Sequence, residues 1–156
     1  PDVNPLFTFA VPGYNMRSSE INAVLGLEQI KRLDYNIQKR QDNLKIWLSN
    51  LDNRLFYKEY FVEGSSNYAL PLILNKGVDK MYEVCQILEK EGVEYRLGTA
   101  GGGNQARQPY LERYEFKVVG ELKTSDYIHD CGLYIGNHPE LKEEQIISLC
   151  RRLNNV

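Results

Sequence analysis

Residues 13–34 read GYNMRSSEINAVLGLEQIKRLD, a polar turn that runs directly into an amphipathic helix. Within the turn, Asn15 and Arg17 carry donors that suit an anion. Ser18 or Ser19 can cap the helix that follows. From these residues alone, the turn is either a capped helix entry or a site where donors at a helix N-terminus bind an anion.

Apolar residues recur at three- and four-residue steps from Ser19 to Leu51, which predicts a long helix, either straight or bent. The elements expected after it are strands at 68–74, 93–96 and 133–135 and helices at 79–90, 124–130 and 141–153. Pro71 places the first strand at a sheet edge or a bulge, and Gly92 stands where a helix C-cap glycine belongs. This order indicates an α/β (α+β) fold: a long N-terminal helix and a small, mainly antiparallel sheet covered by helices.

The length and the charge distribution of the chain limit the kinds of protein that it can be. A chain of 156 residues is about one domain, large enough to bury a core. Its 19 basic and 21 acidic residues are interleaved rather than gathered in a block, which argues against a nucleic-acid partner. Its longest apolar run, at 68–74, is far shorter than the ~20 residues of a membrane helix. We therefore expect a soluble domain with no membrane partner.

The three cysteines, Cys85, Cys131 and Cys150, are widely spaced and form no CxxC pair. This pattern predicts neither a disulfide framework nor a metal site, and it favours the reducing cytoplasm. The chain opens with PDVNP, without a charged leader and an apolar segment behind it. We interpret that opening as the entry into a fragment of a longer protein.

The turn at 13–17, followed by INAVLGLEQI at 21–30, resembles the signature of the DegT/StrS-type sugar aminotransferases, which use pyridoxal phosphate (PLP). That family also contains PLP-dependent sugar 3-dehydratases. The resemblance implies an aspartate-aminotransferase-like fold and a nucleotide-linked 4-keto-6-deoxy sugar as substrate. It covers only the C-terminal part of such an enzyme, with an entry segment and cofactor-facing turn at 1–18 and a small C-terminal domain at 19–156.

The resemblance also implies where the cofactor is held. In the family, the asparagine of the GYN turn reaches the PLP phosphate of the neighbouring subunit, and a nearby arginine supports phosphate or carboxylate binding. Asn15 and Arg17 are the matching residues, and the whole enzyme is expected to be a homodimer. The Schiff-base lysine, replaced by histidine in the dehydratase branch, belongs to a region that this chain does not match. We expect no catalytic residue in the chain and no activity from it alone.

Two further stretches, 92–111 and 127–141, are similar to the family's sugar-nucleotide pocket and closing strand. The candidate substrate residues are Arg96 and Arg107 for the diphosphate, and Asn104, Asn137 and His138 for the hexose hydroxyls. The alternative for each arginine is an ordinary surface ion pair. His138 is also a candidate for proton transfer, and its alternative is a local hydrogen bond. His129 has no spaced partner, so we interpret it as structural or surface.

Gly-Asn-Gln at 103–105 and Gly-Asn-His at 136–138 replace the histidine-tyrosine-proline run and the proline-leucine pair of many aminotransferases in the family. These two sequence patterns favour the dehydratase branch of the family. The sequence thus predicts part of an enzyme that aminates or 3-dehydrates a nucleotide sugar for deoxy or amino sugars of surface polysaccharide. The alternative is a non-catalytic α/β ligand-binding or interaction module.

Overall fold

The structure, a computed structural model, describes residues 18–75, 77–98 and 103–156. It divides the chain into two compact units, Pro1–Asp34 and Tyr35–Val156. None of the helices in these described ranges is long and apolar enough to cross a bilayer.

The first unit contains helix α1, Glu20–Ile30. Ser19 is its N-cap, since its hydroxyl oxygen accepts a hydrogen bond from the backbone N–H of Asn22 at 3.4 Å. This confirms the predicted cap. Within the described residues, no side chain of α1 is buried. Its large apolar side chains are each 59–72% exposed, and they are Ile21, Val24, Leu25, Leu27 and Ile30.

The predicted long helix is interrupted at Lys31 and Arg32, and α2 then runs from Leu33 to Asn50. The buried residues of α2 recur at helical spacing and end in Trp47 and Leu48. Trp47 is fully buried and donates its indole N–H to the backbone carbonyl of Pro71 at 2.9 Å. This bond ties α2 to the neighbouring sheet.

The sheet has three strands in the order β1-β3-β2, namely β1 (Ala69–Ile73), β2 (Tyr95–Leu97) and β3 (Gly132–Gly136). Both pairings are antiparallel. Tyr134 lies opposite Pro71 on one side and opposite Arg96 on the other. Because β1 is an edge strand, Pro71 needs no partner for the N–H it lacks, as predicted.

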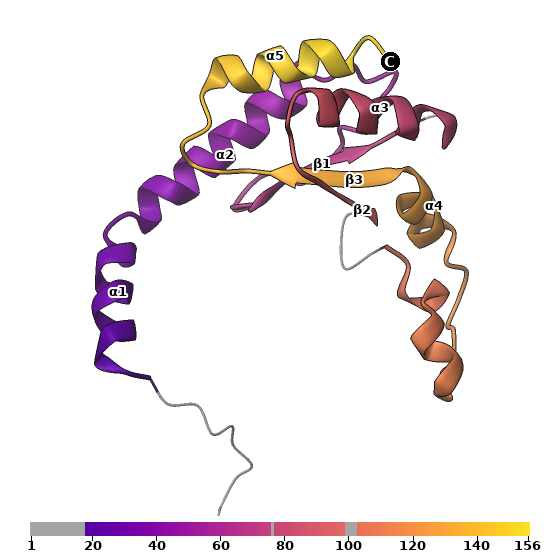
Figure 1. Cartoon of the computed structure of the whole chain (residues 1–156), viewed down its shortest axis with the longest axis horizontal. Helices are drawn as coiled ribbons and strands as arrows, with labels where there is room; N and C mark the ends of the chain where they lie inside the picture. Colours follow the sequence, from indigo (N-terminus) through magenta and orange to yellow (C-terminus); the bar gives the residue numbers. More distant parts are fainter. Residues whose placement is uncertain (1–17, 76, 99–102) are drawn as a thin grey trace, which may run out of the picture. The chain divides into compact units, whose positions relative to one another are not determined.

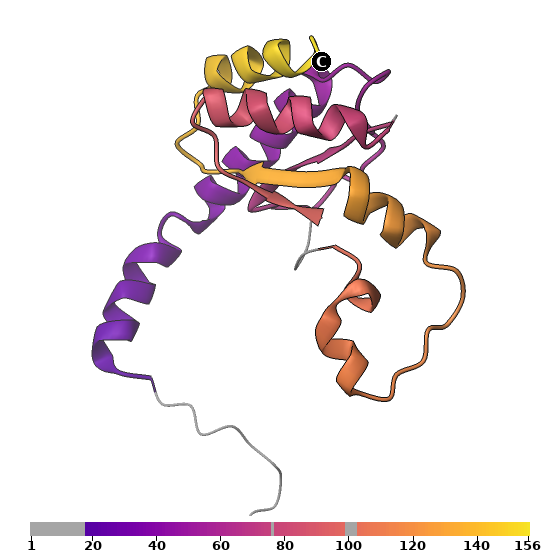
Figure 2. The same ribbon diagram turned by 45° about the vertical axis from the view of Figure 1, so that its right-hand side comes forward.

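Three further helices complete the second unit: α3 (Asp79–Lys90), α4 (Lys123–Cys131) and α5 (Glu143–Leu153). Helices α2, α3 and α5 cover one face of the sheet (Figures 1 and 2). The buried strand residues Leu70, Leu72, Leu133 and Ile135 belong to the core that includes this layer. The antiparallel sheet and its helical cover confirm the predicted fold class.

Individual residues explain where several of the helices begin and end. Gly92 follows the end of α3 with φ +66° and its N–H bonds to the carbonyl of Glu89, which confirms its predicted role at the helix C-terminus. The helix expected at 124–130 starts with Thr124 and Ser125, residue types that often cap a helix, but neither of them caps it. Helix α4 begins earlier, at Lys123, and its N-cap residue is Leu122, with no side-chain cap. The backbone carbonyl of Leu122 accepts the N–H of Asp126, so no hydroxyl is needed at the cap.

Candidate functional site

The two predicted cofactor residues, Asn15 and Arg17, lie outside the described residues. The five predicted substrate residues all lie within them, and the structure separates them into three places. Asn137 and His138 follow β3, Arg96 is on β2, and Asn104 and Arg107 lie beside α4.

Asn137 is almost fully buried, with 2% of its surface exposed. Its side-chain amide nitrogen donates to the carbonyls of Arg40 at 3.0 Å and Asn67 at 2.9 Å. Its side-chain oxygen accepts from the amide of Asn43 at 3.0 Å. Asn137 therefore links α2, the segment before β1 and the end of β3, and both of its amide protons are engaged within the fold.

His138 is exposed beside this buried asparagine. Its Nδ1 accepts the backbone N–H of Glu140 at 3.2 Å, and its own carbonyl accepts from the side chain of Asn43 at 3.2 Å. The local hydrogen bond that the sequence offered as one alternative is therefore present. Because Nδ1 acts as an acceptor here, Nε2 carries the proton of the neutral ring and is the atom that can meet a ligand.

Arg96 projects from the middle of β2, and its guanidinium lies 2.6 Å from the carboxylate of Glu94, both side chains being well exposed. A hollow of about 270 Å³ adjoins this pair. The hollow is lined by Glu94, Tyr95, Arg96, Tyr134 and Gly136. Tyr134, which lines this hollow, also contacts the ring of Tyr68 edge-to-face, with ring centroids 5.8 Å apart. Arg96 thus stands at the edge of an aromatic surface.

Asn104 and Arg107 are brought together against α4. Asn104 caps the short 3₁₀ turn Gln105–Arg107 by accepting the N–H of Ala106 at 3.0 Å. Its amide nitrogen donates to Asp126 at 2.8 Å. The guanidinium of Arg107 donates to Asp130 at 2.8 Å and lies 3.8 Å from Asp126. The side chains of both candidate residues are therefore held in place by acidic side chains of α4.

The sequence did not single out the α4 residues that hold this cluster. Asp126, His129 and Asp130 are spaced i, i+3 and i+4, which places them on one helix face. This spacing is the feature of the sequence from which the shared helix face could have been predicted. The residues that this face contacts lie more than twenty positions earlier in the chain, and the spacing does not reveal them.

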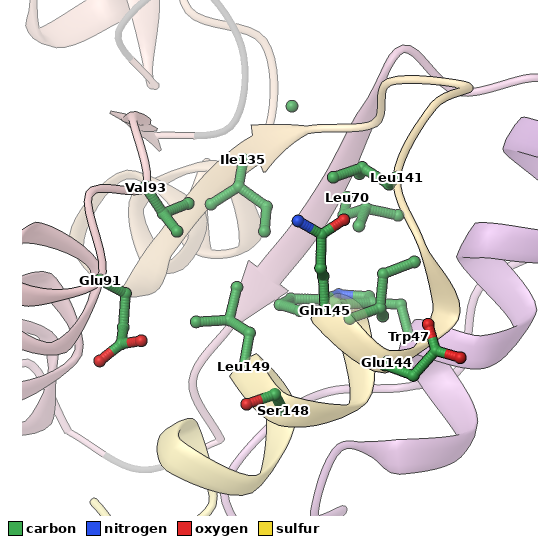
Figure 3. A pocket seen from close by; sticks show the side chains of 12 residues that line it. Trp47, Leu70, Glu91, Val93, Ile135, Leu141, Glu144, Gln145, Ser148 and Leu149 are labelled. Atoms are coloured by element: carbon green, nitrogen blue, oxygen red, sulfur yellow. The ribbon is translucent and has the colours of Figure 1, made fainter.

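A further cavity lies elsewhere in the second unit. It has a volume of about 440 Å³ and a mainly apolar lining drawn from α5, strands β1 and β3, Trp47 of α2 and the turn before β2 (Figure 3). No predicted site residue lines it. Its polar groups include Glu91, which pairs with Arg152 at 2.9 Å, and Gln145, which caps its own helix.

Two of the described thiols, Cys131 and Cys150, are poorly suited to nucleophilic chemistry. Burial raises the pKa of Cys150 to about 12. Burial also raises the pKa of Cys131, and the charge of Asp130 adds to the effect. Both sulfurs are therefore protonated near neutral pH. Over residues 18–75, 77–98 and 103–156, no three His, Cys, Asp or Glu side chains are grouped so that they could hold a metal ion.

The sequence matches the DegT/DnrJ/EryC1/StrS aminotransferase family over residues 4–154, so the chain belongs to that family. It is 29% identical to a GDP-4-keto-6-deoxy-D-mannose 3-dehydratase of Yersinia pseudotuberculosis over 92% of this chain and 37% of that protein. It is 30% identical to a UDP-4-amino-4,6-dideoxy-N-acetyl-beta-L-altrosamine transaminase of Campylobacter jejuni, over 83% of this chain and 34% of that protein.

The fold is also that of solved family members. A GDP-4-keto-6-deoxy-D-mannose-3-dehydratase of E. coli, solved with bound hydrated PLP, has a TM-score of 0.81 and 25% identity to this chain. The alignment covers 95% of this chain and 38% of that one. The chain therefore spans a little over one third of the length of its relatives. These matches confirm the resemblance that the turn at 13–17 and the helix after it indicated.

Proposed function

We propose that this chain is the small C-terminal domain of a PLP-dependent enzyme that acts on a nucleotide-linked 4-keto-6-deoxy sugar. The observation that carries the proposal is the family match over residues 4–154, together with relatives that act on such sugars. Residues 1–18 form the entry segment and the cofactor-facing turn, and residues 19–156 form the domain proper. The free thiols Cys85, Cys131 and Cys150 accord with a cytoplasmic enzyme.

Within the family we favour 3-dehydration. Gly136-Asn137-His138 departs from the proline-containing pattern of many aminotransferases, and both relatives described here as dehydratases align along most of the chain. The experiment is to incubate the full-length protein with PLP, glutamate and nucleotide 4-keto-6-deoxy sugars and to analyse the product by mass spectrometry. A product that lacks the 3-hydroxyl supports dehydration. A product that has gained nitrogen shows aminotransfer, and an unchanged sugar opposes both.

PLP, when bound, supplies an electron sink that stabilises a carbanion on the substrate. The part of the chain that we assign to its phosphate is the turn with Asn15 and Arg17, because amide and guanidinium donors before a capped helix suit a phosphate. Asn15→Ala in the full-length protein should weaken PLP binding about tenfold. Asn22→Ala, one turn into α1, is the matched control and should leave it unchanged. Equal affinities for all three proteins would refute the phosphate role.

For the substrate, we assign Arg96 and Arg107 to the diphosphate and Asn104, Asn137 and His138 to the sugar hydroxyls. The exposure of Arg96 beside Tyr134 supports its role, because its guanidinium is held by an exposed carboxylate, that of Glu94, and by a long bond to the Tyr95 carbonyl at 3.4 Å, both of which a diphosphate can displace. Arg107 already pairs with Asp130, so a diphosphate has to compete with that bond. The amide protons of Asn137 are engaged, which leaves an oxygen lone pair for a hydroxyl donor.

The whole enzyme, we further propose, is a homodimer in which α1 is covered by the second subunit. The support is that the five large apolar side chains of α1 are each 59–72% exposed and its polar side chains are few, and such an exposed apolar surface is typical of a helix that packs inside a larger assembly. Leu25→Glu in the full-length protein should therefore yield monomers in light scattering, whereas Glu28→Lys on the same helix should not. An intact Leu25→Glu dimer would contradict this assignment.

The isolated chain should be inactive, because no part of it resembles the region that carries the family's lysine or histidine. Turnover by the 156-residue chain on its own would refute this part of the proposal.

A further inference from the structure

His129, on α4, is hydrogen-bonded to the segment that carries two of the candidate substrate residues. Its ring nitrogen Nδ1 accepts the backbone N–H of Asn104 at 3.1 Å. Asn104 is 7% exposed and lies 25 positions earlier in the chain, so the contact is tertiary. The imidazole therefore fixes the backbone at the point where the 3₁₀ turn Gln105–Arg107 begins.

Gly103 fits against the same ring. A Cβ atom at this position would lie 2.6 Å from Nδ1 of His129 and 2.9 Å from its Cγ, distances that real contacts do not reach. Gly103 also has φ +83°, a conformation that side-chain-bearing residues rarely adopt. The absence of a side chain at this glycine thus lets the ring approach the backbone closely enough to accept the Asn104 N–H.

The neighbours of His129 on α4 hold the side chains of the same segment. Asp126 accepts from the amide of Asn104 at 2.8 Å, and Asp130 accepts from Arg107 at 2.8 Å. One face of α4 therefore fixes Asn104 by its backbone and its side chain, and Arg107 by its guanidinium. Of these three contacts, the one through His129 is the one that a neutral imidazole makes and an imidazolium cannot.

The protonation state follows from the hydrogen bond. Nδ1 can accept only in the neutral ring that carries its proton on Nε2, whereas protonation turns both ring nitrogens into donors. A protonated ring would then point one N–H at another, that of Asn104. Among the described residues, the charged groups of this cluster are Asp126 and Asp130 on α4 and Arg107 on the facing segment, and the ionisable sequence neighbours of His129 on α4 also include Tyr127, whose hydroxyl donates to the Leu74 carbonyl, and Cys131.

We propose that His129 is a positioning residue: its neutral imidazole fixes the backbone at Asn104, and with it the turn that carries Arg107, in place for the nucleotide sugar, whereas its protonation removes this backbone contact and leaves the bonds to Asp126 and Asp130. The structural half of this inference stands on the contacts of His129 alone. The functional half rests on the proposed function, since it takes Asn104 and Arg107 as substrate residues.

The first test is an NMR pH titration of the 156-residue chain over about pH 5 to 8, following the His129 ring and the Asn104 amide. The amide signal should shift with the same midpoint as the ring. In His129→Asn, the side-chain oxygen can take the place of Nδ1, so the bond should persist without a titration. In His129→Leu, the amide should resemble that of the wild-type chain at low pH and exchange faster with solvent.

Gly103→Ala is the second variant, because it displaces the ring without removing it. It should reproduce the His129→Leu amide shift while the other α4 amides stay in place. An Asn104 amide that is independent of pH in the wild-type chain, or unchanged in both His129→Leu and Gly103→Ala, would overturn the structural half.

The second test uses the full-length enzyme. His129→Leu should raise the KM for the nucleotide sugar about tenfold with a smaller change in kcat, and His129→Asn should restore it. If the NMR result holds but the KM does not change, Asn104 and Arg107 do not bind substrate and the functional half is refuted. If the enzyme neither binds PLP nor turns over any nucleotide sugar, the proposed function fails, while the NMR result still decides the structural half.

Discussion

The indole N–H of Trp47 donates to the backbone carbonyl of Pro71 at 2.9 Å, and this bond joins the buried face of α2 to the edge strand of the sheet. Trp47 is completely buried, so the bond forms where water cannot replace it. The residue therefore contributes packing and a hydrogen bond at the same place, and the two contributions can be separated by mutation.

Trp47→Phe keeps an aromatic ring but leaves the Pro71 carbonyl without its donor, which should lower the free energy of unfolding by about 1–3 kcal/mol. Trp47→Ala also removes most of the packed volume and should cost about 3–5 kcal/mol. Urea denaturation of the 156-residue chain measures both. A Trp47→Phe variant as stable as the wild-type chain would show that the hydrogen bond adds nothing, and equal losses in the two variants would show that the packed ring adds nothing beyond it.

Asn137 should prove important for stability whatever its role toward substrate. Asn137→Ala removes the donor to the Arg40 and Asn67 carbonyls and the acceptor for Asn43, so we expect a loss of about 2 kcal/mol or more. Asn155→Ala is the control, since it removes an exposed amide bond at the end of α5 and should change stability by about 0.5 kcal/mol or less. A loss no larger at Asn137 than at Asn155 would contradict the buried network.

Cys150 predicts a pH dependence of stability at the alkaline end. Burial raises its pKa in the folded state from 9.0 to about 12. Its contribution is therefore fully present below pH 9, where both states hold the proton, and is lost as the pH rises toward about 12 because the unfolded thiol ionises first. The difference in unfolding free energy between wild type and Cys150→Ala should shrink over that range. A constant difference would contradict it.

Substitutions at Gly26 and Gly92 distinguish the effect of backbone strain from the effect of steric contact. A Cβ atom would meet nothing within 4 Å at either Gly26 or Gly92, but only Gly92 has a positive φ, +66°. Gly26→Ala in the middle of α1 should therefore favour the helix by about 0.5–1 kcal/mol, visible as increased helicity in circular dichroism. Gly92→Ala should destabilise the chain in urea denaturation. A loss of helicity in Gly26→Ala would refute the open surroundings of α1 in this chain.

Local signals predicted much of the fold. The bounds of α3 follow from its apolar spacing and from Gly92, and the edge position of β1 follows from Pro71. The sequence allows for a bend in the long helix, but it does not place the break at Lys31 and Arg32, because the apolar period continues across these residues. Such a period reports which face is apolar, and it does not report where the backbone turns.

The contacts within the candidate site were harder to predict from the sequence than the fold. The family resemblance drew attention to Asn104 and Arg107, but their partners come from a helix more than twenty residues away. His129 was set aside because no side-chain partner stood at a motif spacing. Its partner is a backbone N–H, which no residue pattern displays, and the closeness of Gly103 to its ring exists only in the folded chain.

The central claim is that this chain is part of a PLP enzyme, and the most direct measurement is the absorbance spectrum of the full-length protein with PLP, before and after borohydride reduction. We predict bound cofactor that borohydride does not attach to the protein, as expected where histidine replaces the Schiff-base lysine. Covalent attachment would instead assign the enzyme to the aminotransferase branch. A folded full-length protein that binds no PLP would contradict the account.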